Sequence, residues 1–392
     1  MTRGHTPILA LLLIGLVGCR DDAESPTGPD AQAALATGPA PARSYYQVSG
    51  GYDHSCGVTT DQVTFCWGSG LLGDGQEYLR VPPQLVAGGH QFRQVSSGGD
   101  QNCAVNTANR AYCWGRNGYG QLGDGTTTDR STPVLVGGGG NFRQVDISTF
   151  HACGVGYTDG RVYCWGRNSE GQLGDGSTTQ RFTPVPVAGA RKFRQVRVGW
   201  THTCGLATSG EAFCWGSNSD GQIGDGSTAK RRLRPTRVAG GLIFRQLDVG
   251  FSHVCGVTTN NRAFCWGNGG AGQIGDGKTD QRFTPRAVTG GLTFDRVSTG
   301  YYHTCGETTD NRAYSWGENE NGQLGDGTFT RRSRPVGVGG GLTFTQLSAG
   351  DFHTCGIASG AAAYCWGWNW GGQLGDLTIT DRSTPVPVTG ES

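Results

Sequence analysis

The sequence contains little of what catalytic, nucleic-acid-binding or helical proteins usually display. Of 392 residues one is methionine, 16% are charged, and basic and acidic side chains nearly cancel to a net charge of +1. A nearly neutral chain has no strong basic field, so we expect no nucleic-acid partner. Apolar residues do not recur at a helical period over any long stretch, which excludes a helical bundle. Without a Gly-Lys-Ser/Thr phosphate loop or a calcium loop with alternating acidic ligands, we expect no cofactor and no metal.

The one long hydrophobic run lies near the N-terminus. Arg3 precedes the apolar residues 8–18, a run that is too short to span a bilayer and indicates an export signal. Residues 16–19 resemble a bacterial lipoprotein signal, so we expect a signal peptide at 1–18 and a lipid on Cys19. The alternative is an ordinary secretory signal in which Cys19 is incidental. Either interpretation places the rest of the chain outside the cytoplasm, and lipidation would anchor it to the cell envelope.

The remainder of the chain is a set of repeats. Each repeat has four short segments typical of β-strands, such as FRQVRVG, HTCGLAT, EAFCWG and TPVPV, with a glycine-rich loop before the last. Because repeats bury their apolar faces against their neighbours, we predict an all-β, seven-bladed β-propeller at 44–392, behind a flexible linker at 19–43. The repeats are about 50 residues long and are marked by seven Trp-Gly pairs, at Trp67, Trp114, Trp165, Trp215, Trp266, Trp316 and Trp366.

The cysteines fit export, because disulfides persist outside the cytosol. Within a repeat, Cys204 and Cys214 flank a turn and are expected to face each other in a hairpin. Cys305 has Ser315 in place of a partner and is expected to be a free thiol. The alternative is a zinc site made by His202 with the two cysteines. The predicted disulfides join Cys56 to Cys66, Cys103 to Cys113, Cys153 to Cys164, Cys204 to Cys214, Cys255 to Cys265, and Cys355 to Cys365.

The loop after each Trp-Gly pair carries a family resemblance. Residues 165–174, with the pattern Trp-Gly-x-Asn-x-x-Gly-Gln-Leu-Gly, and the Gly-x-x-His at 199–202 resemble the repeat of the regulator of chromosome condensation family. This resemblance implies a seven-bladed propeller. The first copy, at 67–72, departs from the pattern and is three residues shorter. If the first strand completes the last blade, YYQVSG from Tyr45 should pair beside TPVPV near Pro385.

Residues copied in every repeat are expected to serve the fold. We expect each Trp to fill the wall between blades, and each Arg that stands three residues before a proline, such as Arg181, to pair with the loop aspartate, such as Asp175. A buried or hydrogen-bonded structural role is expected for the six recurring histidines, His54, His151, His202, His253, His303 and His353.

The informative positions are those that vary while remaining large. The two residues before each histidine lie where one strand turns into the next, so the seven pairs should gather on one face around the axis. Aromatic residues there favour a protein-binding face, and packing between blades is the alternative. Trp368 and Trp370, in the last Trp-Gly loop, form a second candidate surface. The candidate binding residues in the pairs are Tyr52, Phe150, Trp200, Phe251, Tyr301, Tyr302 and Phe352.

We therefore predict a non-catalytic propeller that binds a protein, peptide or glycan. Exported bacterial members of the resembling family include an inhibitor of β-lactamases, so enzyme inhibition is one form of this prediction. The family's nuclear members are guanine-nucleotide exchange factors, which is one alternative, although no repeat here has an insertion large enough for the wedge that such exchange uses. The other alternative is an envelope enzyme with its site in the channel, for which Glu307 is the nearest approach to a unique acid.

Overall fold

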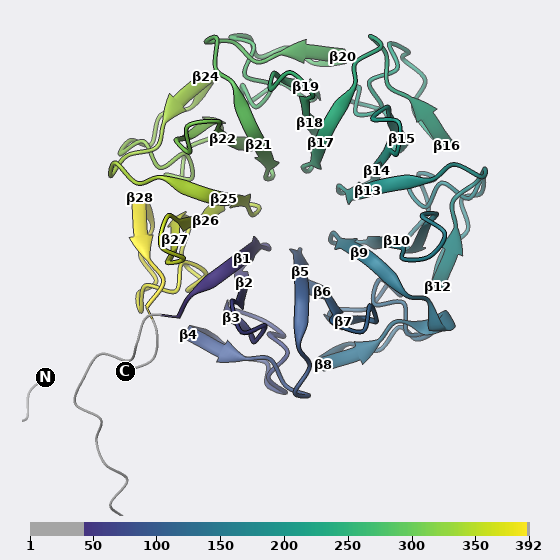
Figure 1. Ribbon diagram of the computed structural model, residues 1–392, viewed down its shortest axis with the longest axis horizontal. Coiled ribbons are helices and arrows are strands. Elements are labelled where there is room, and N and C mark those ends of the chain that lie inside the picture. The colour runs from purple at the N-terminus through teal and green to yellow at the C-terminus, as the bar shows by residue number, and fades with distance from the viewer. Residues whose placement is uncertain (1–42, 390–392) are drawn as a thin grey trace, which may run out of the picture. The chain divides into compact units, whose positions relative to one another are not determined.

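The computed structural model describes residues 43–389 and shows seven four-stranded antiparallel sheets around a central axis (Figure 1). Each sheet is contiguous in sequence, with its strands hydrogen-bonded in chain order. The predicted seven-bladed all-β propeller is confirmed. The predictions of a signal peptide at 1–18 and a lipid on Cys19 lie outside the described residues. Within the described range, no helix is long and apolar enough to cross a membrane.

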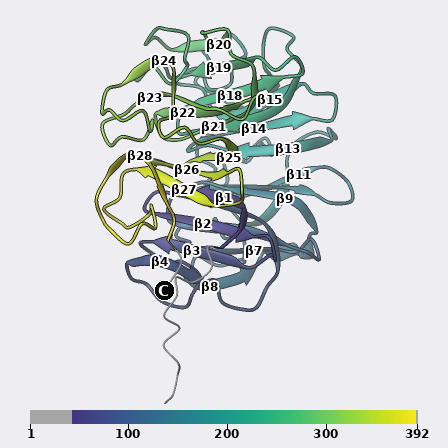
Figure 2. The same cartoon turned by 60° about the vertical axis from the view of Figure 1, so that its left-hand side comes forward.

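The first strand of each blade lies nearest the axis and the fourth lies at the rim (Figures 1 and 2). The inner strands are β1 (Tyr45–Gly50), β5 (Phe92–Gly98), β9 (Phe142–Ile147), β13 (Phe193–Val198), β17 (Phe244–Val249), β21 (Phe294–Thr299) and β25 (Phe344–Ala349). The second strands are β2 (His54–Thr59), β6 (Gln101–Asn106), β10 (His151–Gly156), β14 (His202–Ala207), β18 (His253–Thr258), β22 (His303–Thr308) and β26 (His353–Ala358).

The two outer strands of each blade complete the sheets. The third strands are β3 (Thr64–Gly68), β7 (Ala111–Gly115), β11 (Val162–Gly166), β15 (Ala212–Ser217), β19 (Ala263–Gly267), β23 (Ala313–Gly317) and β27 (Ala363–Gly367). The rim strands are β4 (Arg80–Leu85), β8 (Arg130–Leu135), β12 (Arg181–Pro186), β16 (Arg231–Arg237), β20 (Arg282–Ala287), β24 (Arg332–Gly337) and β28 (Arg382–Pro387), and a short 3-10 turn, η1 (Gly137–Gly139), follows β8.

The disulfides lie where the spacing predicts them. In β14 and β15, Cys204 is the direct partner of Cys214 across the antiparallel pair, and the two sulfur atoms are bonded. Since this bond uses both sulfur atoms, the zinc interpretation of the two cysteines is wrong. In the sixth blade Cys305 faces Ser315 and is a buried free thiol, as predicted.

The same hairpin disulfide occurs in five other blades, so all six predicted bonds are confirmed. Each of them joins the second strand of its blade to the third. These five bonds join Cys56 to Cys66, Cys103 to Cys113, Cys153 to Cys164, Cys255 to Cys265, and Cys355 to Cys365.

The hydrophobic core consists of the walls between neighbouring blades. Residues of the third blade, such as Val155 and Leu173, pack in one cluster with Val196 and Trp215 of the fourth. The Trp215 ring is fully buried, and its indole N–H donates to the backbone oxygen of Gln172 in the preceding blade at 2.9 Å. The predicted role of the repeated tryptophans in these walls is confirmed.

The Trp-Gly loop needs glycine where it meets the next wall. Gly174 has a φ of +68°, and a Cβ on it would lie 2.6 Å from the indole nitrogen of Trp215. A side chain here would meet both backbone strain and a steric clash. The loop also contains the expected ion pair, in which Arg181 contacts Asp175 at 3.0 Å. Equivalent Arg–Asp pairs occur in the second and the fourth to seventh repeats.

The shortened first repeat leaves a defect in the wall that follows it. Six of the seven wall tryptophans donate their indole N–H to a backbone oxygen in the loop of the preceding blade. Trp114 finds no such oxygen among the described residues, because the loop before it, at 67–72, lacks the glutamine and is shorter. Its ring is nevertheless fully buried.

The ring closes differently from the expectation. β1 is the inner strand of the first blade and β28 the rim strand of the last, so the prediction that the Tyr45 strand pairs beside the Pro385 segment is wrong. Figure 1 shows β1 beside β25 instead. The Gln346 side chain of β25 bonds both backbone groups of Val48 in β1, accepting from its N–H at 2.9 Å and donating to its oxygen at 2.8 Å.

This glutamine bridge is repeated around the axis. Gln94, for example, donates to the backbone oxygen of Val145 and accepts from its N–H. The sixth blade has Arg296 in place of the glutamine, and there the carboxylate of Glu307 accepts from the backbone N–H of Leu347. Glu307 is buried and is the direct strand partner of Arg296. The unique acid that the sequence singled out therefore bonds the backbone of the next blade.

Candidate functional site

The loops that join the inner strands to the second strands gather at one end of the axis, as predicted. They line a cavity of about 480 Å³, to which all seven blades contribute. We call this cavity, together with the two residues before each histidine position, the mouth. Because each pair lies between two strands fixed in the sheet, the fold positions seven variable pairs around one opening.

Aromatic side chains form an arc around the mouth. Trp200 and Phe251 have ring centroids 4.0 Å apart, and Phe251 stacks on Tyr301 at 3.8 Å. These distances permit favourable aromatic contacts. Successive members, with centroids 3.8–5.6 Å apart, are Phe150, Trp200, Phe251, Tyr301, Phe352 and Tyr52. The structure thus brings together six of the predicted binding residues, one from each of six blades.

The remaining candidates lie at the edge of this arc. Tyr302 contacts Tyr301 edge-on at 4.6 Å. Trp368 contacts Tyr52 and Phe352, at 5.6 and 5.8 Å, so the surface predicted in the last Trp-Gly loop joins the arc. Trp370 is 74% exposed, as the sequence led us to expect.

The arc is partly accessible. Tyr52 and Trp200 are 36% and 37% exposed although their rings contact neighbouring rings. The aromatic rings of neighbouring blades therefore pack on one another, as the alternative interpretation expected, and part of their surface remains exposed. Beyond Phe150 the arc continues to Tyr119, a residue of the second Trp-Gly loop that was not among the predicted candidates.

Three carboxylates line the mouth together with the aromatic rings. Asp53, Asp100 and Asp351 line the cavity from the first, second and seventh blades. They were missed as candidates although they occupy the same variable pairs as the aromatic residues. The mouth is therefore both aromatic and acidic.

Burial and mutual repulsion shift the pKa values of these acids. Burial, and next the charges of Asp100 and Asp53, raise the pKa of Asp351 to about 7. Burial, and next the charge of Asp100, raise the pKa of Asp53 to about 6. One buried oxygen of Asp53 has no hydrogen-bond partner among the described residues. Carboxylates that are unpaired and hard to ionise mark a site whose polar groups are not used by the fold.

Comparison with known proteins identifies the family. The chain matches the RCC1-like domain over residues 137–392, and the regulator of chromosome condensation (RCC1) repeat over 109–158 and 92–121. The chain belongs to the RCC1-like domain family. The resemblance inferred from the Trp-Gly loop is confirmed.

Individual relatives of this RCC1-like propeller are matched over short segments. The human E3 ubiquitin-protein ligase HERC2 is 47% identical over 53 residues, 13% of this chain and 1% of that protein. The ultraviolet-B receptor UVR8 of Arabidopsis thaliana is 29% identical over 122 residues, 30% of this chain and 28% of the receptor. The aligned segments thus span under a third of either relative.

Solved structures share the fold over most of the chain. Prp20p of Saccharomyces cerevisiae, described with its binding properties to Gsp1p and histones, has a TM-score of 0.74 at 22% identity, covering 85% of this chain and 87% of that one. Human WBSCR16 has a TM-score of 0.73 at 19% identity, covering 81% and 88%. At these identities the likeness shows the fold alone.

Below the mouth of the RCC1-like propeller, the recurring histidines bridge neighbouring blades. His151 Nε2 lies 2.7 Å from Thr203 Oγ1 in the next blade. Burial lowers the pKa of His151 to about 3, so the ring is neutral. Four other histidines make the same kind of contact with serine, threonine or asparagine. His202 has no partner among the described residues, because the next blade has Val254 at the partner position.

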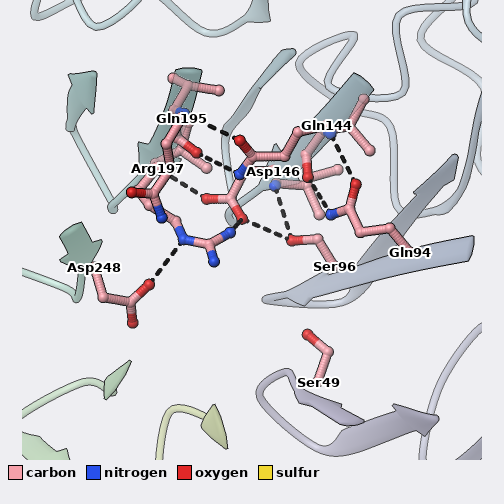
Figure 3. A network of polar contacts seen from close by, with 12 residues as sticks. Ser49, Gln94, Ser96, Gln144, Asp146, Gln195, Arg197 and Asp248 are labelled. Carbon is pink, nitrogen blue, oxygen red and sulfur yellow. Dashed lines mark hydrogen bonds and ion pairs between the residues drawn. The ribbon is translucent and has the colours of Figure 1, made fainter. Parts of the chain in front are cut away.

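The channel beyond the mouth is polar and contains ion pairs. A second cavity of about 310 Å³ shares with the mouth the ends of the inner strands, such as Val198 and Val249. Figure 3 shows Arg197 in this region, bonded to Asp146 at 3.0 Å and to Asp248 at 3.0 Å. Here each of the two acids has an opposite charge beside it, in contrast to the mouth.

Proposed function

We propose that this RCC1-like propeller is a non-catalytic binding protein that engages a protein, peptide or glycan through the mouth. The observation that carries the proposal is the continuous aromatic arc around an open cavity, contributed by residues that differ between repeats. Large aromatic rings held by a rigid ring of blades bind with little loss of conformational entropy. Enzyme inhibition is one form that such binding takes, since a partner seated on the mouth would be covered.

The location of this binding is outside the cytoplasm. Six disulfides indicate an oxidising compartment. We propose further that a lipid on Cys19 tethers the propeller to the cell envelope. Replacing Cys19 with Ala should move the full chain from the membrane fraction to the soluble fraction, and an unchanged distribution would contradict the tether.

Glu307 supplies no reason to prefer an enzyme. Its carboxylate accepts from a backbone N–H of the next blade, and the side chain lines neither axial cavity. We also do not propose guanine-nucleotide exchange activity. The similarity to Prp20p, at 22% identity, shows a shared fold and does not extend to that protein's binding properties.

An affinity capture tests the proposal. The full chain is presented to envelope and secreted proteins beside a variant with four arc residues replaced by alanine. The matched control is Tyr157→Ala, because Tyr157 is 57% exposed but lies in the turn after β10, away from the mouth. We expect a partner that binds the wild type and the control and is lost by the variant, provided that thermal melting shows the variant folded. Equal capture by all three would refute binding through the arc. The four substitutions are Trp200→Ala, Phe251→Ala, Tyr301→Ala and Phe352→Ala.

A further inference from the structure

The mouth is lined by acidic side chains as well as aromatic ones, and no basic side chain lines it among the described residues. Among the described residues that line its cavity there is no lysine or arginine, whereas there are three aspartates. Among the described residues neither Asp53 nor Asp351 forms a salt bridge, and one buried oxygen of Asp53 has no hydrogen-bond partner. Arg116, whose charge interacts with that of Asp100, is already held by Glu77 at 2.9 Å and by Asp129 at 3.0 Å.

The channel next to the mouth contains carboxylates that do have charged partners. Asp146 and Asp248 are shared by Arg197, and Asp146 also accepts from the backbone N–H of Val198 at 2.7 Å. Figure 3 shows these contacts from close by. The fold therefore has the means to neutralise a buried acid. At the mouth it brings three acids together without doing so.

The aromatic arc is the second, independent feature that points to a cation. Indole and phenol rings carry a negative face that attracts a positive charge placed over it. Trp200, Phe251 and Tyr301 line the same cavity as the three aspartates. The acids come from the adjacent seventh, first and second blades, so a group in the cavity meets these carboxylates on one side and the rings of the fourth and fifth blades on the other.

The size of the cavity sets the scale of the ligand. About 480 Å³ admits a long side chain and does not admit a folded domain. Arginine suits these surroundings better than lysine, because its planar guanidinium stacks on aromatic rings and donates in a fork to carboxylates. It is also less strongly hydrated than an ammonium group, so its transfer from water costs less.

We propose that the mouth captures an arginine side chain presented by the protein or peptide partner, with the aromatic arc around it and the three aspartates as counter-charge. The inference rests on the proposed function, since it names the chemistry by which that partner is recognised. In this proposal the aromatic rings provide contact area, and the carboxylates provide selectivity for positive charge.

The direct test uses a pair of peptides of nearly the same shape, of which one carries a guanidinium and the other a neutral urea group. The probes are N-acetyl-Gly-Arg-Gly-amide and the same peptide with citrulline, which keeps the shape of arginine without its charge. We expect saturable calorimetric binding of the arginine peptide to the full chain, and at least tenfold weaker binding of the citrulline peptide. Equal binding of the two, or no binding of the arginine peptide at millimolar concentration, would overturn the proposal.

A pair of variants locates the binding. Asp53→Asn together with Asp351→Asn should weaken the arginine peptide at least tenfold. The matched control is Asp310→Asn, in the turn after β22 at the far end of the strand from the mouth. In the wild type, the Asp310 carboxylate accepts a hydrogen bond from the Thr308 hydroxyl. In the fifth blade Asn260 accepts the equivalent hydrogen bond from Thr258, so asparagine fits this position. This control should leave binding unchanged, and an equal loss in both variants would overturn the assignment.

Failure of this inference is distinguishable from failure of the proposed function. A partner that is lost with the four aromatic substitutions but kept by the aspartate variant would retain the binding function and refute arginine capture. A partner kept by both would refute the mouth as a binding site. Both conclusions require that the variants melt cooperatively near the wild-type temperature, and the single change Trp200→Ala serves if the four-fold variant does not fold.

Discussion

The two ends of the central channel are made by the same seven strands and differ in whether their polar groups have partners. Along the inner strands, Gln346 bonds the backbone of Val48 in the next blade. Near the start of β13, the Arg194 guanidinium donates to the backbone oxygen of Phe244 at 2.7 Å. At the mouth, Asp53 and Asp351 form no salt bridge among the described residues, and one buried oxygen of Asp53 has no hydrogen-bond partner. Repeated residues thus join the blades through hydrogen bonds, whereas the variable acids of the mouth make no such bridges.

This difference separates residues that hold the ring from residues that are free to bind. A buried polar group without a partner costs stability, so a fold keeps one only where something else is gained. In the walls and the glutamine bridges, residues of one blade contact residues of the next blade. We propose that the mouth, in contrast, is complementary to a binding partner.

The largest expected difference is between two tryptophans, one in a wall between blades and one at the mouth. Trp215→Ala removes a fully buried ring from a wall and should destabilise the protein by about 3–5 kcal/mol. Trp200→Ala removes a ring at the mouth that is 37% exposed and should cost about 1 kcal/mol or less. Urea unfolding followed by circular dichroism measures both. Similar losses in the two variants would mean that the mouth is part of the scaffold.

A gain in the scaffold is expected from Ser315→Cys. Cys305 and Ser315 face each other in the register that carries a disulfide in the six other blades, so the new cysteine should pair. A bond that closes such a short loop should contribute roughly 2–3 kcal/mol. Unfolding with and without a reductant reports the gain, and loss of the free thiol confirms the bond. A variant that stays reduced and unchanged in stability would show that the sixth hairpin differs from the rest.

Removing charge from the mouth should stabilise the fold while weakening binding. The pKa of Asp351, about 7, exceeds its ordinary value of 3.8 because of burial and the neighbouring Asp100 and Asp53. The Asp351 carboxyl group therefore binds its proton more tightly in the folded state than in the unfolded state. The stability that this protonation contributes is fully present below about pH 4 and is lost as the pH rises to about 7. The titratable phenol of Tyr52 lies beside the same acids.

Asp351→Asn should therefore be more stable than the wild type at pH 8, by on the order of 1 kcal/mol after solvent screening, and equal to it at pH 4. Thermal melts of both proteins across this pH range provide the measurement. Lower stability of the variant at pH 8 would show that the carboxylate has a partner in the fold, which would remove the distinction between the two ends.

The smallest effect concerns the wall behind the shortened loop. Trp165→Phe loses a hydrogen bond from the indole N–H to the Gln121 oxygen at 2.8 Å, whereas Trp114→Phe has none to lose among the described residues. The first change should cost more than the second by about 1 kcal/mol. Paired denaturant titrations resolve such a difference, and equal costs would indicate that Trp114 has found another acceptor.

The repeated part of the molecule was predictable from the sequence because each residue type recurs with its partner. The Trp-Gly loop predicted the walls, the spacing of Cys204 and Cys214 predicted the hairpin disulfides, and the position of Arg181 predicted its contact with Asp175. Ring closure was predicted wrongly, because the contact of Gln346 with Val48 joins residues at opposite ends of the propeller sequence, and the recurring glutamine does not by itself reveal its partner.

The candidate site was predicted in part. The aromatic residues before the histidines were chosen for their size, and the structure brings Trp200, Phe251 and Tyr301 together. Asp53 and Asp351 stood in the same pairs and were passed over, because an isolated aspartate in a loop is ordinarily solvated. Their significance comes from convergence of the first and last blades, which only the closed ring provides.

The central claim is that the mouth binds and the walls hold. A photo-crosslinking amino acid placed at position 200 or at position 157 of the full chain, both exposed, tests it without depending on affinity. After illumination with envelope and secreted proteins, we expect one discrete crosslinked product from position 200 and none from position 157. Products of equal yield from both positions, or from position 157 alone, would contradict it.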